Sequence, residues 1–211
     1  MKTKTFVLLI TLLIGFQELA MAQDLRNKIK KSVISIEDTF SEIPKERIIS
    51  LDQLASTMEK KFSDGKQLNV VFIDKENLVT SQLAMVWLRT GLLYYGVDKF
   101  SIHSAGTNAE RQPLTKLALL EQYGFKVANA DGKQPFTYSV NYGKDNWILH
   151  SKTIQSLDLF TDQAVVIFVE KGNSPIEKTN KEEILFPSNE TIARDMLYVS
   201  SRLKNHLTTE Q

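Results

Sequence analysis

The stretch LNVVFIDKENLVTSQLAMVWLRTGLLYYGVDKFSIHSAGT, residues 68–107, has the pattern of a strand, a loop, a helix and a second strand. Its first six residues, 68–73, are mostly apolar and β-branched, which is typical of a strand buried on both faces. Asp74 ends this run, and polar residues then lead to Ser81, which we expect to be the N-cap of the helix. Apolar residues at helical spacing continue to Gly96, a residue suited to a helix C-terminus.

The loop between Asp74 and Ser81 occupies a position that commonly binds anions. A second strand is expected at residues 100–103, running into residues 104–107, so the stretch predicts a parallel βαβ unit. Backbone N–H groups and the positive end of the helix dipole meet in such a loop. The sequence therefore predicts a loop whose geometry suits phosphate.

The text around this loop resembles the low-molecular-weight protein tyrosine phosphatase and arsenate reductase family. The resemblance rests on the strand, the seven-residue loop, the Ser-Gln-Leu-Ala-x-Val-Trp run at residues 81–87 and the Ser-Ala-Gly-Thr motif at 104–107. In the family the loop reads Cys-x5-Arg-Ser. Here Asp74 stands at the Cys position and Thr80 at the Arg position, whereas Asn77 and the Ser after the Arg are retained. The residues that mark the family's scaffold are therefore present, and the catalytic Cys and Arg are not.

The resemblance extends from about residue 24 to the C-terminus and implies an α/β fold of the phosphotyrosine phosphatase I type. We expect three layers, with a central, mostly parallel sheet of about four strands flanked by helices. Residues 23–66 contain two apolar helical stripes separated by Pro44, which predict an N-terminal two-helix extension that covers the core. Residues 67–211 would form the phosphatase-like domain, in one globular unit with that extension.

The remaining elements follow from local patterns. Pro113 is expected to open a helix with Leu114, Leu117, Ala118 and Leu120 inward and Gly124 at its end. Alternating aromatic residues predict a hairpin at a sheet edge. The expected segments are a short strand at 125–127, the hairpin at 136–149, a buried strand at 164–169 and a final helix at 191–207.

Residues 1–22 have the features of a signal peptide. Lys2 and Lys4 form a basic region, residues 6–16 an apolar core, and Ala20-Met21-Ala22 a cleavage site. The alternative is an uncleaved membrane anchor, but the apolar run is short for a span. We therefore expect export to the periplasm or outside the cell, with no stable membrane anchor after cleavage.

Composition excludes several functional classes. The 211 residues include 26 Lys and Arg against 25 Asp and Glu, so nothing indicates a nucleic-acid partner, which usually requires a basic excess. The absence of cysteine excludes disulfides, thiolate metal sites and a thiol nucleophile. The three histidines fall at unrelated spacings, so we expect no metal site and no cofactor.

Catalysis of the kind that the resemblance implies requires a thiolate, an Arg that binds the phosphoryl oxygens, and an Asp that protonates the leaving group. The family's Asp-Pro segment is shortened here to residues 184–187, so all three groups are missing. No catalytic residue is therefore expected in the degenerate loop, which consists of Asp74, Lys75, Glu76, Asn77, Thr80 and Ser81. Asp74 is interpreted as a built-in anion that accepts the loop N–H groups. The candidate ligand-binding residues are Asn77, Ser81, Ser104 and Thr107.

Two functional hypotheses follow. The first is an exported, catalytically inactive phosphatase or arsenate reductase-like protein that binds an unknown small ligand or protein. The second is a metal-assisted phosphatase or other hydrolase that uses Asp74, since the strand and loop superficially resemble the haloacid dehalogenase-type phosphatases. Glu76 would then have to serve as the second acid, two residues after Asp74.

Overall fold

The computed structural model describes residues 25–62, 67–97, 99–130, 136–157, 164–171 and 181–209, with the side chains of 181 and 206–209 left aside. The signal peptide expected at residues 1–22 lies outside these ranges. Within them, no helix has both the length and the apolar character needed to cross a bilayer.

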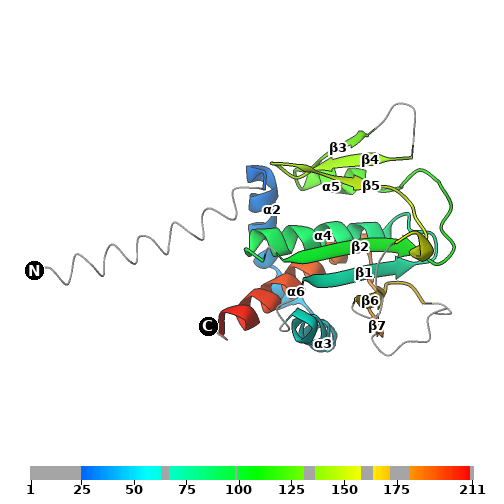
Figure 1. The fold of residues 1–211 in the computed structure, drawn as a ribbon. Helices are drawn as coiled ribbons and strands as arrows, with labels where there is room; N and C mark the ends of the chain where they lie inside the picture. Colours follow the sequence, from blue (N-terminus) through cyan, green and yellow to red (C-terminus); the bar gives the residue numbers. More distant parts are fainter. Residues whose placement is uncertain are drawn as a thin grey trace, which may run out of the picture.

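A four-stranded, fully parallel sheet forms the centre of the molecule (Figure 1). Its strand order is β2-β1-β6-β7, which confirms the predicted α/β architecture. The fourth strand, β7, was not predicted, because its Lys-Glu-Glu sequence has no apolar pattern. The strands are β1 (Leu68–Asp74), β2 (Phe100–Gly106), β6 (Val165–Phe168) and β7 (Lys181–Glu183).

Helix α4 (Thr80–Tyr94) connects β1 to β2 and is buried along most of its length. It ends at Tyr94, and Gly96 occupies the C′ position beyond it, as predicted, with a φ of 77° that suits glycine. The Gly96 N–H donates to the Leu93 carbonyl and the Val97 N–H to the Leu92 carbonyl, which is the Schellman pattern. The central βαβ prediction is therefore confirmed.

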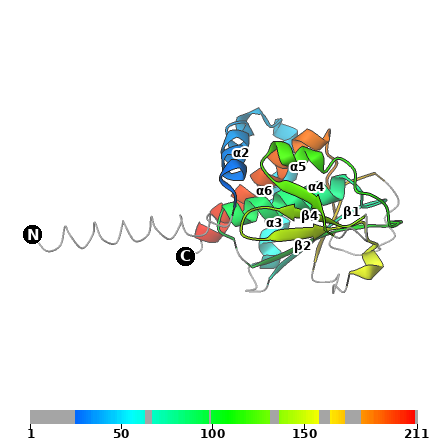
Figure 2. The same ribbon diagram turned by 90° about the horizontal axis from the view of Figure 1, so that it is seen from above.

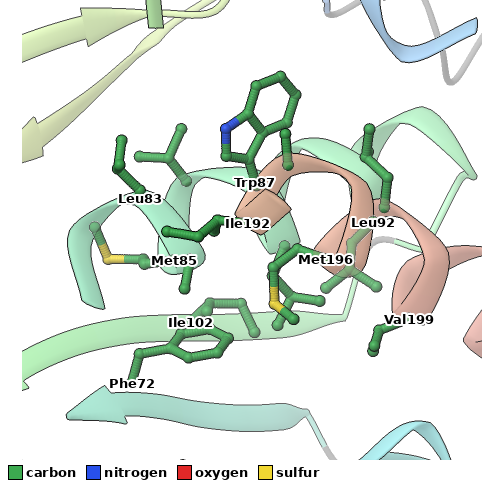
Figure 3. Close-up of a cluster of buried hydrophobic side chains, with 14 of the residues drawn as sticks. Phe72, Leu83, Met85, Trp87, Leu92, Ile102, Ile192, Met196 and Val199 are labelled. Atoms are coloured by element: carbon green, nitrogen blue, oxygen red, sulfur yellow. The ribbon is translucent and has the colours of Figure 1, made fainter. Parts of the chain in front are cut away.

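The long helices pack on one face of the central sheet. Figure 3 shows Phe72 of β1 and Ile102 of β2 facing apolar side chains of α4 and α6. The apolar faces of both N-terminal helices are buried in the same core, as expected. Besides α4, these helices are α2 (Asn27–Glu37), α3 (Lys45–Phe62) and α6 (Asn189–Thr209). Leu25 forms a bridge to Gly143 before α2 begins.

A shorter layer covers the other face of the sheet. Ile154, in the 3-10 helix η3 (Ile154–Ser156), and Leu157 pack there on a second apolar cluster that includes Val71 and Phe168. Figure 2 shows η3 on the opposite side of the sheet from α4 and α6.

The predicted hairpin forms and belongs to a separate antiparallel sheet of order β3-β4-β5. This sheet lies on the β2 side of the central sheet (Figure 1). The strand expected at 125–127 therefore pairs with the hairpin and adds nothing to the central sheet. The three strands are β3 (Lys126–Asn129), β4 (Tyr138–Asn141) and β5 (Asn146–Leu149).

The helix expected from Pro113 is much shorter than predicted. It comprises five residues, α5 (Ala118–Gln122), because Lys116 has a φ of 61° and interrupts a helical path. Ala118, expected to face inward, is exposed. Gly124 ends the helix as predicted, with a φ of 101°.

Candidate functional site

The degenerate loop lies at the C-terminal end of β1, against the end of β2. The Thr107 N–H donates to the Asp74 carbonyl (3.0 Å), and the Asn108 N–H to the Lys75 carbonyl (2.8 Å). A Cβ on Gly106 would lie 2.7 Å from the Lys75 carbonyl oxygen. The glycine of the Ser-Ala-Gly-Thr motif therefore allows the loop to pack directly on β2.

The Asp74 carboxylate points into the loop. It is buried, and its Oδ1 accepts the Asn77 N–H at 2.5 Å while its Oδ2 accepts the Ser81 N–H at 3.0 Å. The prediction that Ser81 caps α4 is wrong, because the helix begins at Thr80 and Val79 occupies the N-cap position without a side-chain cap. The Asp74 carboxylate, seven residues before Ser81, accepts the Ser81 N–H in place of an N-cap side chain. This is the geometry of a built-in anion.

A second carboxylate takes part in the loop. Glu170, which follows β6, accepts the Lys75 N–H at 2.9 Å. Burial raises the pKa of Asp74, hydrogen bonds from Ser81 and Asn77 oppose that rise, and repulsion from Glu170 adds to it. Three loop N–H groups thus donate to the protein's own carboxylates.

Sequence reasoning missed Glu170 and considered Glu76 as the second acid. Glu76 is exposed, and its carbonyl accepts the Ser151 hydroxyl (3.0 Å). Glu170 follows a buried parallel strand and so lies at the C-terminal edge of the sheet. That position could have indicated from the sequence that Glu170 belongs to the site.

The candidate residues Asn77 and Ser81 are bonded inside the loop. Asn77 has a φ of 56°, and its Nδ2 donates to the Ser81 Oγ at 2.9 Å. Its Oδ1 accepts the Gln82 Nε2 (3.0 Å) and the Lys152 N–H (3.1 Å). Both side chains are buried and hold the loop against its surroundings.

The other loop and motif residues differ in their exposure. Lys75 is exposed, and Thr80 is half-buried as the first residue of α4. Ser104 is buried, and its hydroxyl has no partner in the part of the chain that the structure describes. Thr107 is half-buried and lines a cavity beside the loop, whose lining does not include Asn77, Ser81 or Ser104.

That cavity has a volume of about 240 Å³ and opens at the C-terminal edge of the central sheet. This is the crevice in which open α/β sheets usually bind ligands. Both carboxylates of the site line it, together with two ammonium groups, so its polarity is mixed. The lining residues are Ile73, Asp74, Lys75, Thr107, Asn108, Phe168, Glu170 and Lys171. Across the described ranges, no group of three or more His, Asp or Glu side chains could hold a metal ion.

Comparison with solved structures finds similarity to phosphatases and arsenate reductases. One is an arsenate reductase in its phosphate-binding state, with 18% identity, a TM-score of 0.38, and coverage of 68% of this chain and 96% of the other. A low-molecular-weight phosphotyrosine phosphatase of Vibrio cholerae O395 has 18% identity, a TM-score of 0.41, and coverage of 68% and 97%. A thioredoxin-dependent arsenate reductase of Corynebacterium glutamicum has 16% identity, a TM-score of 0.40, and coverage of 86% and 83%.

No family model and no curated protein sequence matches this chain. The structural similarities concern the fold alone. The chemistry of the site therefore has to be argued from this chain's own residues.

Proposed function

We propose that this protein is an exported, catalytically silent relative of the low-molecular-weight phosphatases and arsenate reductases that acts as a binding or interaction module. The observation that carries the proposal is the position of the Asp74 carboxylate, on the N–H groups of Asn77 and Ser81. These are the amides that a bound oxyanion would otherwise occupy.

The loop chemistry supports catalytic silence. A carboxylate is a far weaker nucleophile than a thiolate, and Thr80 offers no guanidinium to bind phosphoryl oxygens. Asp74 also repels an incoming anion, by about 4 kcal/mol per pair of unit charges at 4 Å and an effective dielectric constant near 20. The chain contains no cysteine that could replace the missing nucleophile.

The binding role is assigned to the 240 Å³ cavity beside the loop. Thr107, Asn108 and Lys75 present a hydroxyl, a carboxamide and an ammonium group at its wall. The volume suits a small molecule or one side chain of a protein partner. The Asp74 and Glu170 carboxylates hold the adjoining loop in shape.

Enzyme assays test directly the proposal that the protein is catalytically silent. The mature protein, residues 23–211, is incubated with an aryl phosphate, with and without Mg²⁺ or Mn²⁺, and with arsenate and a thiol donor. We expect no turnover above a heat-denatured control. A Mg²⁺-dependent activity that Asp74→Asn and EDTA both abolish would instead establish the metal-assisted hydrolase.

Restoring the family residues tests whether the backbone is still a phosphate cradle. Asp74→Cys with Thr80→Arg removes the internal anion and adds a guanidinium. We expect millimolar sulfate to shift the backbone amide resonances of Asn77 and Ser81 in this variant. Thr80→Arg alone, which retains Asp74, is the matched control and should show much smaller shifts.

Turnover in the double variant should remain feeble, because no general acid is present and such a group typically contributes about 10²–10⁴-fold. A folded double variant with unshifted amides would contradict the phosphate-cradle interpretation. Export is tested separately, by mass spectrometry of the secreted or periplasmic protein, which should begin at Gln23.

A further inference from the structure

Three basic side chains gather at the outer edge of β2, away from the cavity. We call Arg89, His103 and Lys152 the basic cluster. They come from α4, from β2 and from the segment that follows β5. The cluster brings together residues that are up to 63 positions apart in the chain.

Arg89 is held in a defined orientation. Its Nε donates to the Ile102 carbonyl at 3.0 Å, and its Nη2 donates to the same oxygen. The guanidinium carbon lies 5.6 Å from the centre of the Trp147 ring. These contacts use one edge and one face of the guanidinium and leave Nη1 available to a ligand.

Lys152 is anchored through its main chain. Its N–H donates to Asn77 Oδ1 (3.1 Å), and its carbonyl accepts the Gly106 N–H (2.9 Å). The next residue, Thr153, forms a parallel bridge to Gly106, so this segment runs beside the edge of β2. The ammonium group therefore extends from a rigid position, and it has no hydrogen-bond or ion-pair partner among the described residues.

His103 completes the cluster from the strand itself. Its Nε2 lies 2.6 Å from the Ser101 hydroxyl, which leaves Nδ1 for a further partner. Burial, then Arg89, then Lys152 lower the pKa of His103 to about 4. Burial lowers the pKa of Arg89 to about 10, and burial followed by Arg89 lowers the pKa of Lys152. The three groups thus lie close enough to repel one another.

No carboxylate balances this charge in the part of the chain that the structure describes. Arg89 and Lys152 take part in none of its ion pairs. The whole chain carries a formal charge of only +1, so the basic cluster arises because the fold brings these residues together and not because the chain is rich in basic residues. Half-buried cations without a counter-ion are costly, and an anion placed between them would relieve that cost.

We propose that the basic cluster is a binding site for a doubly charged oxyanion, either inorganic phosphate or sulfate or a phosphoryl group on a larger molecule. The Arg89 Nη1, the Lys152 Nζ and the His103 Nδ1 would donate to its oxygens. The site lies behind the degenerate loop, to which Lys152 is joined by its N–H bond to Asn77. None of the three cluster residues lines the cavity, so this proposal does not depend on the role proposed for the cavity.

The test uses the mature chain, with sodium sulfate and inorganic phosphate as probes against sodium chloride at matched ionic strength. We expect saturable binding by calorimetry and a rise of about one unit in the pKa of His103, followed by NMR of its ring. Besides Arg89 and Lys152, the titratable and charged groups nearby are Tyr142 beside Arg89 and His150 beside Lys152, with Arg111 beside His150.

Lys152→Met should weaken sulfate binding by about tenfold or more, whereas Lys152→Arg should largely retain it. Lys126→Met removes an exposed lysine on β3 and is the matched control. Tighter binding of phenyl phosphate than of inorganic phosphate would identify a phosphoryl group on an organic carrier, and equal binding a free anion; both support the site. Absence of saturable binding, equal losses in Lys152→Met and Lys126→Met, or unchanged affinity in folded Lys152→Met would each overturn it.

Discussion

At the scale of single residues, Asp74 determines what the loop amides bind. Its removal by Asp74→Ala leaves the Asn77 and Ser81 N–H groups without their acceptor in a buried site. Unpaired buried donors cost about 1–3 kcal/mol each, and relief of the buried carboxylate offsets part of that cost. We expect urea unfolding at pH 7 to show a net loss of about 1–3 kcal/mol in the free energy of unfolding.

Glu170→Ala is the control for this variant. Glu170 is exposed, so water can replace its bond to the Lys75 N–H, and the loss should be below about 1 kcal/mol. Equal losses in the two variants would show that the Asp74 contacts hold the loop no better than a surface bond does.

His103 makes stability depend on pH. Its pKa is lowered to about 4 in the folded protein, from an ordinary value of 6.5, so the native state binds fewer protons between these values. Stability should therefore fall as pH decreases from about 6.5 to about 4, because protonation favours the unfolded chain. We expect His103→Gln to lose less stability over this window, measured by urea midpoints at several pH values without sulfate. Identical pH slopes in the wild type and His103→Gln would contradict the assignment.

At the scale of elements, the contact between α4 and α6 depends on a glycine. A Cβ on Gly91 would lie 2.5 Å from the Ser200 Cβ and would also meet its Oγ. Ser200 is fully buried, so it has no room to move away. Gly91→Ala should lower the free energy of unfolding by about 1–3 kcal/mol through overpacking, despite the better helix propensity of alanine.

Ser200→Gly separates this clash from other effects. Thermal or urea unfolding of both single variants and of the double variant gives a mutant cycle. If the steric account holds, Gly91→Ala should cost much less when Ser200 is already glycine. Additive effects would mean that the two helices do not meet at this pair.

At the scale of the whole molecule, the N-terminal helices share one apolar core with the central sheet, α4 and α6. Arg47 of α3 binds Asp195 of α6 through Nε (2.9 Å) and Nη2 (2.7 Å). Asp52 of α3 accepts the Tyr198 hydroxyl of α6 at 3.1 Å. The helices also bury large apolar side chains, among them Ile29, Val33, Leu51, Leu54 and Met58.

A chain that begins at residue 67 should therefore fail to fold cooperatively. It would expose the apolar surfaces of α6 and of the sheet, and it would leave the buried Asp195 carboxylate without Arg47. Near-ultraviolet circular dichroism and thermal unfolding are compared with those of residues 23–211. A cooperative transition and a native-like spectrum in the shorter chain would contradict the single-unit interpretation.

Local patterns in the sequence were enough to predict the elements nearest the site. Strands β1 and β6 are short apolar runs, and α4 and α6 have apolar residues at helical spacing, so composition and period identify them without knowledge of their neighbours. The loop position follows as well, because a strand that ends in a polar run before a helix places that run at the C-terminal edge of a parallel sheet.

Other features depend on neighbours that only the folded chain provides. β7 has no apolar pattern and becomes a strand because the edge of β6 offers unpaired backbone groups. Lys116 adopts a left-handed conformation that no local residue preference predicts. Glu170 reaches the loop across 95 residues of chain, and Arg89 and Lys152, which are 63 residues apart, come close enough for their charges to interact.

The sequence by itself therefore determined the α/β class, the βαβ unit and the absence of a cysteine nucleophile, since each follows from residue types and their spacing. The tertiary structure decided which partners those residues meet: the amides that Asp74 accepts, the second carboxylate at the loop and the unbalanced cations beside β2. Hydrogen bonds and charge interactions act over a few ångströms in space, and residues far apart in the chain come that close only after the sheet and its helices have packed.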